Sequence, residues 1–203
     1  MNRFRANLSR LLLVLIVPAF LAGCGVNAIP TKDEAVKAQW GEVQNQYQRR
    51  ADLIPNLVST VKGYAAQESS VLVAVTQARA GATQVPSDAS IVNDPAAFQR
   101  YQQAQNNLST AILPLRVLQE AYPDLKSNAN FMALQSQLEG TENRIAISRR
   151  DYIEAVRVYN TELTTFPGRI WRSVMYASAQ PMATFDIPPQ ETQTPRVDFG
   201  TKK

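Results

Sequence analysis

The chain has 203 residues, of which 45% are hydrophobic, 8% aromatic and 19% charged, and this balance is typical of a globular protein. It contains no histidine, which excludes every catalytic or metal-binding mechanism that needs an imidazole from this chain. Its single cysteine excludes an internal disulfide and also sites that need several thiolates, such as zinc knuckles and iron–sulfur clusters. We therefore expect one domain, with no cofactor and no metal site.

The first residues resemble a bacterial secretory leader. Three arginines precede an uninterrupted apolar run over residues 11–22. The run ends at Leu21-Ala22-Gly23-Cys24, a tetrapeptide similar to a lipobox. We expect the leader to be cut between Gly23 and Cys24 and the new N-terminal cysteine to be acylated.

An uncleaved membrane-spanning helix over residues 11–31 is the alternative, because this stretch carries no charge and a span needs roughly 20 apolar residues. Pro18, Gly25 and Pro30 interrupt the stretch, which favours the lipoprotein. Two or more acyl chains anchor a protein stably, so the body is expected to face the periplasm at a membrane surface. Gly25 favours the outer over the inner membrane, because lipoproteins retained in the inner membrane commonly carry aspartate after the cysteine.

Removal of the leader also removes most of the positive net charge. Three of the 21 basic residues and none of the 17 acidic ones lie in the leader, so the mature chain carries a formal charge of +1. Basic residues with interleaved aromatics do not form a stripe anywhere in the sequence. We therefore expect no nucleic-acid partner.

The first part of the body reads as one long helix. Apolar residues recur in two columns seven residues apart from Val36 to Ala78, which is the pattern of a helical seam. Capping oxygens at 31–33 precede the pattern, and stop signals begin at Gly81. Because the register is the same on both sides of Pro55, the pattern predicts a single kinked helix of roughly 45 residues. A break into two helices at residues 52–56 is the alternative.

Two further long helices follow a polar loop at 86–93. Asp94 before Pro95 predicts an N-cap and a first helical position, and Pro123 ends this second helix. A third helix is expected after a cap at Ser127 or Asn128, with an apolar stripe that continues to residue 166.

A shorter fourth helix is expected over residues 169–177. No segment shows the alternating pattern of strands with hairpin turns. The sequence therefore predicts an all-α, antiparallel bundle of three long helices plus a shorter fourth. We divide the chain into a signal peptide (1–23), a lipidated linker (24–30), a helical bundle (31–187) and a disordered, proline-rich tail (188–203).

Several segments of the body resemble the LemA family. They are residues 33–40, 43–58, 60–65, 122–126, 138–145 and 149–152, together with Tyr159-Asn160 and Phe166-Pro167. The resemblance covers about residues 31–187 and implies a bacterial, membrane-attached, all-helical bundle without known catalytic residues. Family members usually keep an uncleaved N-terminal membrane helix, so the lipobox is a departure in the means of anchoring.

Four charged residues form a candidate polar network, and none is assigned a catalytic role. Glu139 and Glu142 are three apart on one helix face, a spacing that suits paired carboxylates, but no third ligand accompanies them. Arg50 interrupts an apolar column and is expected to pair across the bundle with a glutamate such as Glu142, which would fix the register of the helices. Arg149, in the doublet Arg149-Arg150, is the fourth member.

These features favour a non-catalytic scaffold or adaptor, held at the membrane by acylated Cys24 and bound to unidentified envelope proteins. The alternative is an envelope enzyme or binding protein for a small anionic ligand. That alternative requires a pocket between helices in which the glutamates and arginines converge. A third hypothesis gives the amphipathic segment 169–175 a direct action on the membrane.

Overall fold

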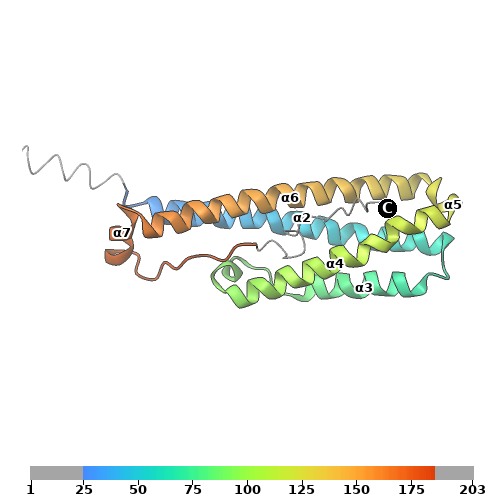
Figure 1. Cartoon of the computed structure of the whole chain (residues 1–203), viewed down its shortest axis with the longest axis horizontal. Coiled ribbons are helices and arrows are strands. Elements are labelled where there is room, and N and C mark those ends of the chain that lie inside the picture. Colours follow the sequence, from blue (N-terminus) through green and yellow to red (C-terminus); the bar gives the residue numbers. More distant parts are fainter. Residues whose placement is uncertain (1–24, 186–203) are drawn as a thin grey trace, which may run out of the picture.

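The structure is a computed structural model that describes residues 25–185 (Figure 1). The helices are α2 (Ala28–Tyr64), α3 (Ser69–Gln84), η1 (Ala89–Asn93), α4 (Pro95–Ala121), α5 (Pro123–Lys126), α6 (Ala129–Thr164) and α7 (Gly168–Val174). Within residues 25–185 there is no strand, and the predicted all-α fold is confirmed. The predicted leader, its cleavage site and the tail from residue 188 lie outside the described residues.

The long helices α2, α3, α4 and α6 lie side by side along the long axis of the molecule (Figure 1). Lys32 pairs with Glu162, and Arg50 pairs with Glu142, so α2 and α6 run in opposite directions. The short helix α7 lies at the end where α2 begins and α6 ends, whereas α5 lies at the opposite end (Figure 1). The bundle therefore has one end that is next to the N-terminal segment and one that is distant from it.

Two predicted helix starts are confirmed by their side-chain caps. A carboxylate oxygen of Asp94 accepts hydrogen bonds from the backbone N–H groups of Ala96 and Ala97 at 2.9 and 3.0 Å. The side-chain oxygen of Asn128 accepts from the N–H of Phe131 at 2.9 Å. These oxygens satisfy donors that have no partner inside the helix, which is why each helix begins at these residues.

The predicted 45-residue first helix is wrong, because the chain folds back after Tyr64. Residues 65–68 form a turn, and α3 then runs antiparallel to α2, with the Nε of Arg79 donating to the backbone oxygen of Ala51 at 2.7 Å. The alternative break at 52–56 is also wrong, since α2 continues through Pro55. Within residues 25–185 the bundle therefore has four long helices rather than three.

Other boundaries of the prediction also differ. Helix α2 begins at Ala28, so it takes in residues 28–30 that were expected in the linker. The expected polar loop at 86–93 contains the 3₁₀-helix η1, whose Ile91 and Val92 are buried. These two side chains are buried with the aromatic residues of the core, so the connection between α3 and α4 is part of the packing.

The core divides into two halves along the bundle. The half nearer α7 is rich in aromatic residues, which are Trp40, Tyr47, Phe98, Tyr101, Tyr152, Tyr159 and Phe185. The distant half is mainly aliphatic and includes Ile54, Leu57, Val61, Val75, Leu108, Ile112, Leu115 and Leu138. Among the described residues, no helix combines the length and the hydrophobicity that crossing a membrane requires.

A segment after α7, residues 175–185, returns along the bundle as a C-terminal strap. Met182 and Phe185 are both buried. The side chain of Asn160 accepts from the Met182 N–H at 2.9 Å and donates to the Met182 carbonyl at 3.2 Å. The N–H of Ala183 donates to the carbonyl of Val92 at 2.8 Å. The backbone groups of the strap thus join the Asn160 side chain on α6 to the backbone of η1.

Candidate functional site

Arg50 lies at the junction of α2, α4 and α6 with 1% of its surface exposed. Its Nη1 donates to the Ser109 hydroxyl at 2.7 Å and to a Glu142 carboxylate oxygen at 3.2 Å. Its Nη2 donates to the side-chain and backbone oxygens of Gln105 at 2.7 and 3.2 Å. Its guanidinium carbon lies 5.0 Å from the centre of the Tyr47 ring. Residues on three helices therefore surround one buried charge.

This geometry can hold the three helices in one register. We call Arg50 with its partners Ser109, Gln105 and Glu142 the structural lock. Both terminal nitrogens of Arg50 are engaged by protein oxygens, and the counter-ion Glu142 retains 30% side-chain exposure at the edge of the bundle. A shift of α2 by one turn against α4 or α6 would separate the charge from these acceptors in a poorly solvated position, at a large energetic cost. The pair thus favours one register of the helices.

The other two members of the candidate polar network lie elsewhere. Glu139 is exposed and accepts from the side chain of Gln135 at 3.2 Å. Arg149 places its guanidinium 4.5 Å from the centre of the Phe185 ring. The structure brings Arg50 and Glu142 together but puts Glu139 and Arg149 outside their network. Gly23 and Cys24 lie outside the described residues.

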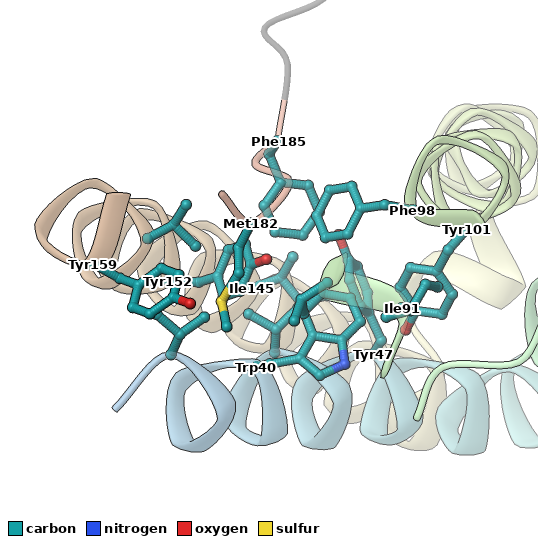
Figure 2. Close-up of a cluster of buried hydrophobic side chains, with 14 of the residues drawn as sticks. Trp40, Tyr47, Ile91, Phe98, Tyr101, Ile145, Tyr152, Tyr159, Met182 and Phe185 are labelled. Carbon is teal, nitrogen blue, oxygen red and sulfur yellow. The ribbon is translucent and has the colours of Figure 1, made fainter. Parts of the chain in front are cut away.

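A buried aromatic cluster fills the half of the core near α7 (Figure 2). The Trp40 ring centre lies 5.4 Å from those of Phe98, Tyr101 and Tyr152, and Phe185 of the strap lies 5.0 Å from Phe98. Such edge and tilted pairs stabilise a core beyond the burial of their surface. Trp40, Phe98, Tyr101 and Tyr152 fall on helical stripes of the sequence. Phe185 was missed because the strap has no helical period.

Burial raises the pKa of the tyrosines in this cluster. Desolvation is the first cause for Tyr47, Tyr101 and Tyr152, because a phenolate is poorly solvated in the core. At Tyr47 the positive charges of Arg149 and Arg50 oppose this rise in pKa. The hydroxyl of Tyr152 donates to the Ala183 carbonyl at 2.7 Å. These tyrosines are neutral core residues, and Tyr152 also holds the strap.

Two hollows on the described part of the molecule do not contain the candidate charged residues. A polar hollow of about 240 Å³ beside Tyr47, Tyr101 and Gln105 has no charged residue in its lining. An apolar groove of about 330 Å³ lies between α2 and α3 and includes Leu72 and Val73. Residues 25–185 contain no group of three carboxylates or thiols suited to a metal ion. Neither of these two hollows is the shared pocket that the anionic-ligand alternative requires.

Two glycines at the end of the bundle near α7 lie close to their neighbours, with little room for a side chain. A Cβ atom at Gly25 would lie 3.1 Å from Pro167 Cγ and 3.2 Å from Trp171 Nε1. A Cβ atom at Gly168 would collide with the backbone oxygen of Glu162. The absence of both side chains lets α7 turn sharply after α6 and lets the N-terminal segment pack against it.

Comparison with known proteins places this bundle in a family. The LemA family model matches residues 39–199, which is more than half of the chain. The chain belongs to the LemA family. The LemA match spans Arg50, Glu142 and the strap, so both the lock and the strap lie within the family region. It confirms the resemblance that the sequence segments indicated.

Two curated relatives from Paramagnetospirillum magneticum, strain AMB-1, are the magnetosome proteins MamQ 1 and MamQ 2. Each is 26% identical to this LemA-family chain over 172 residues. The match covers 76% of this chain and 63% of each relative, so the chain spans less than two thirds of their length.

Proposed function

We propose that this LemA-family protein is a lipoprotein of the bacterial cell envelope, acylated at Cys24. Its helical bundle faces the periplasm, with the outer membrane favoured, and acts as a non-catalytic scaffold or adaptor for other envelope proteins. The packing of Gly25 is the structural observation on which the proposal rests. This residue packs against Pro167 and Trp171 at one end of the bundle, so an acyl group on the preceding residue would attach there.

Family membership and the sequence of the leader support the same proposal. The relatives are magnetosome proteins by name, which is consistent with a membrane-associated role for this chain. Cys24 is the only cysteine and stands at the end of the apolar run in the position that lipid attachment needs. Two or more acyl chains would hold the protein stably, whereas one gives marginal binding.

The first experiment is the intact mass of the protein extracted from membranes, compared with that of a Cys24→Ala variant. The proposal expects a mature N-terminus at Cys24 with added acyl mass, and an unprocessed chain for the variant. A wild-type chain that still begins at Met1 without acyl mass would contradict the lipid anchor.

The adaptor role needs a separate readout. After cross-linking of intact envelopes, the acylated protein is purified and its cross-linked products are identified by mass spectrometry. The proposal expects a reproducible set of protein partners that depends on the folded bundle. Products containing only this chain or lipid would contradict the adaptor role and leave the anchor intact.

A further inference from the structure

The end of the bundle near the N-terminal segment exposes a group of large apolar side chains. Phe166 is 82% exposed, Val174 72%, Met175 56% and Ile170 49%. Ile170 and Val174 are four residues apart and therefore share one face of α7, and Phe166 and Met175 flank this helix. Large apolar side chains exposed at one end of a molecule are a usual mark of an interaction site. We call these four residues the end patch.

The charges within the chain segment that carries the end patch are suited to phosphate groups. Residues 163–185 contain Arg169 and Arg172 and no acidic residue. Arg169 is exposed and has no ion pair within residues 25–185, whereas Arg172 donates to the Ala179 carbonyl at 3.0 Å. The nearest carboxylate along the chain, Glu162, is already paired with Lys32. An apolar face with an unpaired arginine is typical of segments that lie in a membrane interface.

The connection to the chain outside the structure indicates what covers the end patch. Gly25 packs against Pro167 and Trp171, on either side of the start of α7. Cys24 directly precedes Gly25 in the chain. A lipid anchor at the sulfur and amino group of Cys24 would therefore be attached one residue away from the contact with α7. A tether this short keeps the end patch at the membrane surface whenever the anchor is inserted.

We propose that the end patch docks into the membrane interface, so that the bundle stands on the bilayer by its α7 end. Phe166, Ile170, Val174 and Met175 enter the boundary between headgroups and acyl chains, and Arg169 binds lipid phosphates. The long axis of the bundle then points away from the membrane. The α5 end is held about 55 Å from the surface, the length of a 37-residue helix. This inference rests on the proposed anchor at Cys24.

The test uses spin labels on the acylated, full-length mature protein in phospholipid vesicles. Acylation blocks Cys24, so an introduced cysteine provides the only free thiol. Val174→Cys on α7 and Val117→Cys on α4 form a matched pair, because the two valines are 72% and 69% exposed. Collision of each nitroxide with oxygen, which concentrates in lipid, is compared with collision with a water-soluble nickel chelate.

The proposal expects the ratio of oxygen to nickel collisions to be several-fold higher at position 174 than at position 117. Equal, water-like ratios at the two positions would overturn it, and so would lipid-like ratios at both, which indicate a bundle lying flat. The label at 174 could instead be shielded from both reagents, with its spectrum broadened by a neighbouring label. That result would overturn the proposal and assign the end patch to a contact with a second copy of this chain. Intact mass of the same sample reports separately whether Cys24 is acylated, so failure of the anchor and failure of docking give different results.

Discussion

Arg50 carries a positive charge at a position in a seven-residue column whose neighbouring members are apolar. Ser109, Gln105 and Glu142 surround it with oxygen atoms, so its burial is tolerated only in this arrangement. Replacement of such a pair by apolar residues is often neutral, whereas removal of one partner leaves an uncompensated charge. The role of Arg50 in specifying the packing can therefore be separated from its contribution to stability.

We predict that Glu142→Gln lowers the free energy of unfolding by roughly 1–3 kcal/mol, because it removes the charged acceptor from a buried guanidinium. Urea unfolding followed by circular dichroism measures this change. Glu139→Gln is the matched control, since Glu139 is exposed on the same helix, and should change stability by less than about 0.5 kcal/mol. The double variant Arg50→Met/Glu142→Gln should recover part of the loss. If both glutamate variants behave alike, the lock is wrong.

At the scale of elements, the turn between α6 and α7 depends on Gly168. A methyl group there would meet the backbone oxygen of Glu162, which cannot move without bending the end of α6. We predict that Gly168→Ala lowers the free energy of unfolding by about 1–3 kcal/mol through this overpacking. Thermal or urea unfolding measures the change.

Gly81→Ala is the control for this substitution and should have the opposite sign. Gly81 lies inside α3, and a Cβ atom there would have no neighbour within 4 Å. Alanine is favoured over glycine in a helix interior by about 0.5–1 kcal/mol, so this variant should be more stable than wild type. Destabilisation of similar size in both variants would show that the turn tolerates a side chain.

The sequence predicted those elements whose ends have local signals. Asp94 and Asn128 cap helices through their own side chains, and both starts were predicted correctly. The turn at 65–68 was missed because Val61 and Val75 continue the seven-residue columns across it, and periodicity does not report chain direction. A polar run over 67–70 was the available signal.

The candidate site, like the fold, could be predicted from the sequence only in part. The pairing of Arg50 with Glu142 could be expected, because a charge inside an apolar column needs a partner on a facing helix. The positions of Arg149 and Phe185 could not, because the strap is neither periodic nor capped, and its place depends on hydrogen bonds to Asn160 and Val92. Long-range contacts of an irregular segment have no local signature in sequence.

At the scale of the whole molecule, stability should depend on pH in the alkaline range. Buried tyrosines on α2, α4 and α6 have a raised pKa, with desolvation as the first cause at Tyr47, Tyr101 and Tyr152. In the unfolded chain the same phenols ionise near pH 10, so above about pH 10 the unfolded state binds fewer protons than the folded state. The stabilising contribution is therefore complete below about pH 10 and is lost as pH rises towards the folded-state pKa values.

We predict that the free energy of unfolding falls above about pH 10, by up to roughly 1.4 kcal/mol per pH unit for each buried tyrosine. Urea titrations at increasing pH measure it, and ultraviolet absorbance should show these tyrosines ionising only as the protein unfolds. Tyr47→Phe should reduce the slope, because it removes one of these buried phenols. A slope that is the same for Tyr47→Phe and wild type would mean that this phenol reaches solvent. That result would contradict its burial in the cluster with Trp40 and Tyr101 (Figure 2) and beside the Arg50 guanidinium.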